Sequence, residues 1–268
     1  MKNGIDSLFK KNGGRRKALI AYLTAGYPSL NAQRALVKTL INSDIDILEL
    51  GVPFSDPIAD GPTIQYSSHE ALMKGISLHK IIEWLTRFKR EITVPVVLMS
   101  YMNPILSYGI DAFSRDAQKA GVSGLIIPDS IPEENKEIKK VLERRGIHLI
   151  ALVAPTTPEK RLRWVSTKTA GFLYAVSVAG VTGARKNISP QTKRWLSHLR
   201  SVSPSPVCVG FGISTKDHIA SLRGSVDGFI VGSALIDIIR NNRFPKCLGK
   251  LKTFVSTLSK ECHYGRGK

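Results

Sequence analysis

The most constraining feature of this sequence is a regular alternation between short β-rich apolar runs and longer segments of helical period. The alternation continues along the chain without a linker-like stretch, which favours repeated strand–helix units. Eight runs qualify as strands, at residues 18–24, 45–50, 94–100, 122–127, 147–153, 172–177, 207–210 and 226–231. Eight strands close a barrel, and about 250 residues is the usual size of one such domain. The sequence therefore predicts an α/β fold, a single (β/α)8 TIM barrel domain over residues 1–268.

Further helices are expected around this barrel. An amphipathic segment at residues 5–10 precedes the first strand and is placed to plug the bottom of the barrel. Apolar residues follow helical spacing after Ser77 and again beyond Phe244, as expected for outer helices. Extra short helices are expected in the loops that follow strands. The alternative, an open doubly wound sheet, typically carries a glycine-rich dinucleotide turn after its first strand, and the sequence has no G-x-G-x-x-G.

Composition narrows the protein class. Hydrophobic residues make up 43% and charged residues 22% of the chain, which is ordinary for a globular protein. No apolar run approaches the roughly 18 residues of a membrane span, and the N-terminus does not resemble a signal peptide. The three cysteines are widely spaced, so neither a disulfide framework nor a thiolate metal site is indicated. We expect a cytoplasmic protein with no membrane partner.

The net charge of +18 is high and favours anionic partners, including nucleic acid. The basic residues, however, are scattered along helix-like segments such as 136–145 and 160–163, and no nucleic-acid motif accompanies them. Solvated helix faces are therefore the preferred interpretation, and no nucleic-acid partner is expected.

Barrel active sites lie at the carboxyl ends of the strands, so the residues directly after each apolar run are the candidates. Strand alternation places Glu49 on the same face as Ile47, pointing into the barrel mouth. Burial raises the pKa of a carboxyl there toward neutrality, as an acid–base group requires, although an ion-paired or capping Glu is the alternative. The proline-rich loop at 51–62 offers a second carboxylate, Asp60, which is equally well placed to cap a helix beginning near Pro62.

Glycine-bearing turns follow three successive strands, at residues 180–184, 210–212 and 232–233. Glycine allows the backbone to approach phosphate oxygens, and Ser233 adds a hydroxyl donor. Together the turns predict a phosphate site on the other side of the mouth. No histidine lies in these loops, no His/Asp/Glu cluster has metal spacing, and no lysine lies in a strand candidate. Neither a metal site nor Schiff-base chemistry is therefore indicated.

Two stretches, residues 48–65 and 174–185, resemble the tryptophan synthase α subunit family, and the similarity extends over essentially the whole chain. The resemblance implies a lyase that splits indole-3-glycerol phosphate into indole and glyceraldehyde-3-phosphate in tryptophan biosynthesis. It implies catalytic roles for Glu49, Asp60 and Tyr174. The other implied site residues are Tyr22, Ile64, Tyr101, Thr182 and Phe211 for substrate, and Gly183, Gly212, Gly232 and Ser233 for phosphate.

The resemblance also implies a partner. The loops containing Asp56 and Thr182 are expected to close over the substrate and contact a β subunit, which carries pyridoxal phosphate and receives indole in an αββα assembly. No cofactor is expected in this chain. The chain departs from common family members at Tyr27, where Asp usually follows the glycine, and in its positive charge. A catalytically silent activator of a β subunit and a stand-alone lyase remain the alternative functions.

Overall fold

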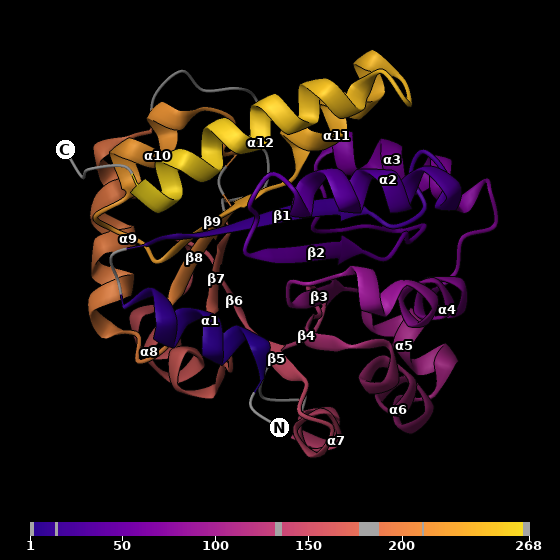
Figure 1. Ribbon diagram of the computed structural model, residues 1–268. Coiled ribbons are helices and arrows are strands. Elements are labelled where there is room, and N and C mark those ends of the chain that lie inside the picture. The colour runs from indigo at the N-terminus through magenta and orange to yellow at the C-terminus, as the bar shows by residue number, and fades with distance from the viewer. Residues whose placement is uncertain (1–2, 14–15, 132–135, 177–187, 211, 265–268) are drawn as a thin grey trace.

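The computed structural model describes residues 3–13, 16–131, 136–176, 188–210 and 212–264. Its strands are all parallel and form one sheet, drawn in Figure 1. The bounds are β1 Ala18–Thr24, β2 Ile47–Gly51, β3 Val96–Met99, β4 Val122–Ile126, β5 His148–Ile150, β6 Leu152–Val153, β7 Leu173–Val176, β8 Val207–Gly210 and β9 Gly228–Val231.

The helices surround this sheet, as Figure 1 shows. Their bounds are α1 Gly4–Asn12, α2 Leu30–Ile41, α3 Pro62–Leu72, α4 Leu78–Phe88, η1 Lys89–Glu91, α5 Met102–Tyr108, α6 Ile110–Ala120, α7 Lys136–Arg144, α8 Glu159–Lys168, α9 Pro190–Val202, α10 Lys216–Leu222, α11 Ser233–Asn242 and α12 Cys247–Tyr264. None of these described helices combines the length and apolar character that crossing a membrane requires.

The barrel closes through the segment 148–153, which the sequence predicts as one strand and the structure divides into β5 and β6. β5 pairs with β4 and β6 pairs with β7, so the two halves form the two ends of the strand order. The division falls at Ala151, whose N–H bonds to the hydroxyl of Thr169 at 3.0 Å while its carbonyl accepts from the Tyr174 N–H at 3.0 Å. The predicted barrel is confirmed, and the predicted strand at 147–153 closes it by pairing with β4 through β5 and with β7 through β6.

Strand alternation separates two apolar layers. One layer lies inside the barrel and consists of Ile5, Ile20, Ile47, Val97, Ile126, Ile150, Phe172, Tyr174, Cys208 and Ile230. The second lies between sheet and helices and includes Leu19, Leu48 and Leu98, the neighbours of interior residues along their strands. Ile5 comes from α1, so this helix closes the amino-terminal end of the barrel, as predicted. The interior layer and α1 therefore fill the barrel below the carboxyl ends of the strands, where barrel active sites lie.

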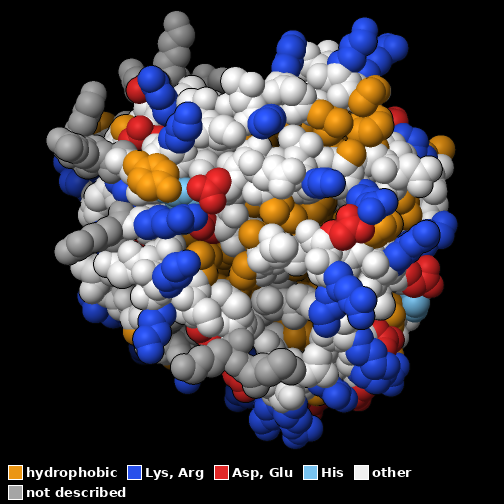
Figure 2. Space-filling model, viewed as in Figure 1, with side chains coloured by type: hydrophobic (Ala, Val, Ile, Leu, Met, Phe, Trp, Pro, Cys, Tyr) orange, Lys and Arg blue, Asp and Glu red, His pale blue; other side chains and the backbone are white. Residues whose placement is uncertain are grey.

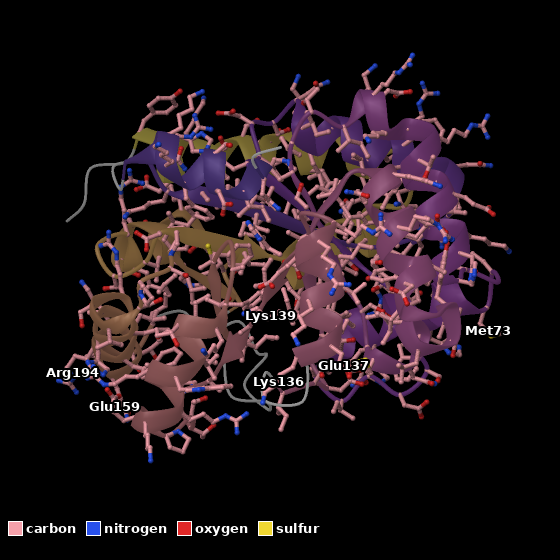
Figure 3. All side chains as sticks on the ribbon, turned by 90° about the horizontal axis from the view of Figure 1, so that it is seen from below. Met73, Lys136, Glu137, Lys139, Glu159 and Arg194 are labelled. Atoms are coloured by element: carbon pink, nitrogen blue, oxygen red, sulfur yellow. The ribbon has the colours of Figure 1, made fainter. Side chains whose placement is uncertain are left out.

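Many Lys and Arg side chains lie on the molecular surface (Figure 2). Figure 2 shows Lys and Arg in several separate groups around the visible face, with Asp and Glu beside some of them. Lys136 and Glu137 of α7, which Figure 3 labels, are exposed, and Lys139 of the same helix is half-buried. Lys139 pairs with Glu143 at 3.7 Å. This distribution agrees with the interpretation of the basic residues as solvated helix faces.

The C-terminal helix α12 is fixed to the start of β2 by a buried histidine. His263 lies between two carboxylates, 2.8 Å from Asp44 and 2.7 Å from Asp46. Asp46 also accepts from the Leu19 N–H at 2.8 Å and pairs with Arg16 at 2.7 Å. Burial alone raises the pKa of Asp46, but the hydrogen bonds from His263 and Leu19 hold it below its ordinary value. Ionised Asp46 therefore stabilises the fold.

We expect Asp46→Asn to lower the free energy of unfolding at pH 7 by about 2 kcal/mol, the usual contribution of hydrogen bonds to a buried ionised group. A carboxyl with a lowered pKa stabilises the fold above its unfolded pKa of about 4 and loses that effect as pH falls. The deficit of the variant should therefore shrink at pH 3, as measured by urea unfolding. Asp44→Asn is the matched control, because Asp44 contacts the same histidine but is 59% exposed. Equal losses in both variants would contradict this account.

Candidate active site

Glu49 lies inside the barrel, as alternation along β2 predicts. In the sheet register Glu49 pairs with Tyr22 of β1, and Glu49 is 0% exposed. Neither carboxyl oxygen has a hydrogen-bond partner among the described residues. Burial, with a smaller contribution from the charge of Asp60, raises the pKa of Glu49 to about 8. An unpaired buried carboxyl is costly for the fold, and it is a group that can hold or release a proton near neutral pH.

Asp60 lies in the loop between β2 and α3, and the structure decides between its two predicted roles. The N-cap of α3 is Gly61, and no side chain caps that helix in the described part of the chain. The Asp60 carbonyl accepts from the Gln65 side chain at 2.8 Å. Burial raises the pKa of the Asp60 carboxyl to about 6, and a hydrogen bond with Tyr101 opposes that rise. Its carboxylate is therefore available to the barrel mouth.

Aromatic side chains surround the two carboxylates. Burial and the nearby carboxylates raise the pKa of Tyr22 and of Tyr174, so both phenols stay protonated. The Tyr101 hydroxyl accepts from the Ala59 N–H at 3.0 Å, and its ring stacks on Phe54 with centroids 4.9 Å apart. Sequence reasoning missed Phe54, although it lies in the loop directly after Glu49. These rings, with the buried Ile64 of α3, make an apolar wall suited to a planar ring.

Two glycines make room for the tyrosines of the site. A Cβ atom at Gly51 would clash with the Tyr22 hydroxyl, and one at Gly210 would lie 2.7 Å from the Tyr174 hydroxyl oxygen. Both glycines end strands, and both serve the close approach of a phenol. The glycine at 210, which the sequence suggests for phosphate, is therefore required here by the packing of Tyr174.

The described phosphate-site residues lie at the ends of β8 and β9, which are neighbours in the sheet. Gly232 is the N-cap of α11 and Ser233 its first residue, and no side-chain cap occupies the free N–H groups at this end in the described residues. Gly212 adopts the left-handed conformation with φ 60°, which favours glycine. A helix N-terminus with free N–H groups attracts an anion without a formal charge. Thr182, Gly183 and Phe211 lie outside the described residues.

Asp56 lies on the exposed outer part of the loop that carries Asp60. It accepts from the Ser55 hydroxyl at 2.5 Å and does not lie among the buried carboxylates. The histidines serve elsewhere: His148 pairs with Asp6 and His198 with Glu159. Within the described ranges no three His, Cys, Asp or Glu side chains gather as a possible metal site.

Together, fold and site define a (β/α)8-barrel enzyme with two carboxyls of raised pKa, an aromatic wall and a helix N-terminus at the carboxyl-terminal mouth. The family model described as tryptophan synthase alpha chain matches residues 8–263. The chain is 46% identical to the tryptophan synthase alpha chain of Geobacter sulfurreducens, covering 91% of this chain and 92% of that protein. It is 43% identical to that of Carboxydothermus hydrogenoformans, with 93% and 95% covered.

Solved structures agree with this assignment. The tryptophan synthase alpha chain of Legionella pneumophila superposes with a TM-score of 0.87 at 34% identity, covering 98% of both chains. A chain of Mycobacterium tuberculosis tryptophan synthase gives a TM-score of 0.89 at 35% identity, covering 99% of this chain and 100% of that one. The chain belongs to the tryptophan synthase alpha chain family, lyases that cleave indole-3-glycerol phosphate in tryptophan biosynthesis. The resemblance noted in the sequence is thereby confirmed.

We expect Glu49→Gln to be more stable than the parent at pH 8, by roughly 2–4 kcal/mol, and nearly equal to it at pH 4. The unfolded chain loses the Glu49 proton near pH 4, whereas the folded chain keeps it until about pH 8. The parent therefore loses stability as pH rises across this interval, and the neutral amide does not. Denaturant unfolding at both pH values measures the difference. Glu70→Gln, a change outside the barrel, is the control and should leave the pH dependence of stability unaltered. If Glu49→Gln also leaves it unaltered, the raised pKa of Glu49 is contradicted.

Proposed function

We propose that this chain, acting as one domain over residues 1–268, cleaves indole-3-glycerol phosphate with Glu49 and Asp60 as its acid–base groups. The observation that carries the proposal is the pair of carboxyls at the mouth, the buried Glu49 with a pKa of about 8 and the half-buried Asp60 with a pKa of about 6. At neutral pH the first is mostly protonated and the second mostly ionised. When two carboxyls differ in pKa, one can act as the general acid while the other, ionised, stabilises positive charge in the same reaction.

Glu49 supplies the proton transfers of this mechanism. Its carboxyl donates a proton to indole C3, which makes the ring an acceptor for the electrons of the C3–side-chain bond. The resulting carboxylate removes the proton of the adjacent glycerol hydroxyl as that bond breaks, giving indole and the aldehyde of glyceraldehyde-3-phosphate. One proton is given and one is taken, so Glu49 returns to its starting state. The lack of hydrogen-bond partners for its oxygens within the described structure suits this exchange.

Asp60 stabilises the charge that this protonation creates. Protonating C3 places positive charge on the indole ring nitrogen, and an ionised carboxylate that accepts its N–H lowers the energy of that state. The hydrogen bond with Tyr101 favours the ionised form of Asp60. Tyr174, buried beside the carboxylates, together with Tyr22, Tyr101 and Ile64 would enclose the ring. Thr182 and Phe211 are proposed to add to this wall.

The phosphate end of the substrate would lie at the ends of β8 and β9. Gly232, Ser233 and Gly212 supply backbone and hydroxyl donors there, and Gly183 is proposed to complete the cradle. The ring of Tyr22 lies next to Gly232, at 3.3 Å from a Cβ built there. The proposed ring and phosphate subsites are therefore in contact through one side chain.

An active enzyme is favoured over a catalytically silent activator because both carboxyls are present at the mouth, with Glu49 fully buried and Asp60 half-buried. A chain selected only for binding a partner has no reason to keep an unpaired buried carboxyl, which lowers stability. A stand-alone lyase differs from the partnered enzyme only in its response to a second subunit.

We propose that the partner is a β subunit carrying pyridoxal phosphate, in an αββα assembly, and that this chain holds no cofactor itself. Apolar side chains are exposed after three neighbouring strands, with Ile58 following β2, Leu106 following β3 and Ile131 following β4. The loops that carry them are linked, since Tyr101 bonds to the Ala59 N–H and the Met102 N–H bonds to Asp129 at 2.9 Å. Exposed apolar side chains gathered beside an active site favour a protein partner there. The loop that carries Asp56 would lie between the active site and this partner.

We expect Glu49→Gln and Asp60→Asn each to reduce indole formation from indole-3-glycerol phosphate by about 10²–10⁴-fold, the usual contribution of a positioned acid or base. Indole release by the purified chain, with and without its β subunit, measures the effect. Circular dichroism should show an unchanged fold. Glu70→Gln, an isosteric change on the outside of α3, should retain full activity. Full activity in the Glu49 variant would refute the mechanism, and parent turnover that does not respond to a β subunit would favour the stand-alone lyase.

We expect Ile58→Glu to weaken binding of the β subunit at least about tenfold, because a charge replaces an apolar contact at the proposed interface. Isothermal titration of the two purified subunits measures this affinity. Met73→Glu is the matched control. Met73 is 74% exposed and Ile58 76%, but Met73 follows α3 at the outer edge of the molecule (Figure 3). Equal loss of affinity in both variants would contradict the assignment of the interface.

A further inference from the structure

The proposed site is assembled from the starts of two helices that are far apart in sequence. Asp60 directly precedes Gly61, the N-cap of α3, and the phosphate turn at Gly232 and Ser233 begins α11. The two helices lie side by side in the upper part of Figure 1. The distance between ring and phosphate subsites therefore depends on how α3 and α11 are held together.

Two side-chain contacts join these helices. The Thr63 hydroxyl donates to the Asp237 carboxylate at 3.2 Å. The guanidinium carbon of Arg240 lies 4.0 Å from the centroid of the Tyr66 ring, within the range of a cation–π interaction. The contacting residues are spaced by three on each helix, which places them on one face about one turn apart. We name these four residues, Thr63, Tyr66, Asp237 and Arg240, the α3–α11 clasp.

The clasp is supported by a buried aromatic residue in the loop after β1. Tyr27 packs edge-on against Tyr66, with ring centroids 6.1 Å apart and an interplanar angle of 78°. Tyr27 is buried, so its ring holds Tyr66 from the side of the loop after β1. An aspartate at position 27 has no ring with which to make this contact. Tyr27 thus belongs to the same group of contacts as Arg240.

We propose that Asp237 and Arg240 are positioning residues that, through the clasp, fix the separation between Asp60 and the phosphate turn. This proposal rests on the proposed function, because it concerns the fit of a substrate with a ring at one end and a phosphate at the other. Neither residue has to touch that substrate. Their effect is to hold the two subsites at one spacing, so that a ligand bridging both is bound in the reactive geometry.

The test distinguishes damage to either subsite from a change in the distance between the two subsites. In the double variant Asp237→Ala/Arg240→Ala, KM for indole-3-glycerol phosphate should rise about tenfold, since a ligand with two linked ends gains affinity only when both ends fit together. Binding of indole alone and of glycerol 3-phosphate alone should change less than about twofold, because each subsite stays intact. Calorimetric titration measures the two fragments, and steady-state kinetics the substrate.

Conservative variants separate the contact from general destabilisation. Thr63→Ser keeps the hydroxyl and Tyr66→Phe keeps the ring, so both should retain the parent KM, whereas Tyr66→Leu should not. Arg34→Ala is the matched control away from the site. Arg34 also pairs with a carboxylate, Glu91 at 2.8 Å, and lies 5.0 Å from the Phe88 ring centroid. This variant should leave both KM and fragment binding unchanged.

The outcomes distinguish the two proposals. An unchanged KM in the double variant, or equal weakening of fragments and substrate, would overturn the positioning role. If the parent chain binds indole-3-glycerol phosphate without cleaving it, the proposed function fails, and the ratio of substrate to fragment affinities still tests the clasp. A parent chain that binds the substrate no better than its fragments would overturn both.

Discussion

Closure of the parallel sheet is the constraint on which the rest of the structure depends. The segment 148–153 supplies both ends of the strand order, pairing with β4 on one side and with β7 on the other. Once the sheet is closed, alternate side chains of every strand meet inside it and exclude water. All carboxyl ends of the strands then point to one mouth. The loops that follow different strands meet there, while α1 closes the opposite end.

The interior layers also explain the chemistry of the mouth. Ile47 lies in the apolar interior, and Glu49, two residues further along the same strand, is the next side chain on that face. Its carboxyl is removed from water without receiving a partner from the described residues, and its pKa rises for that reason. The stabilising contacts lie at the other end, where His263 joins α12 to Asp46. Stability and reactivity thus occupy opposite ends of the barrel.

Much of the fold could be predicted because strand periodicity is a local property. β1 and β8 have their predicted bounds, and the inward orientation of Glu49 follows from its distance to Ile47. The division of residues 147–153 into two strands could not be predicted, because it depends on the Thr169 hydroxyl, which replaces a strand partner at Ala151. The stacking of Phe54 on Tyr101 joins two loops, so the local sequence pattern could not predict it either.

The sequence by itself determined the barrel, the family and the positions of the acidic and glycine residues, because each is encoded in short runs of neighbours. Only the tertiary structure decided that Asp60 faces the mouth and does not cap α3, whose N-cap is Gly61. Only the tertiary structure brought Tyr66 beneath Arg240. The pKa values of the carboxyls likewise depend on burial by strands and loops far apart in the chain. Such desolvation is a property of the packed interior and cannot be inferred from any single stretch of sequence.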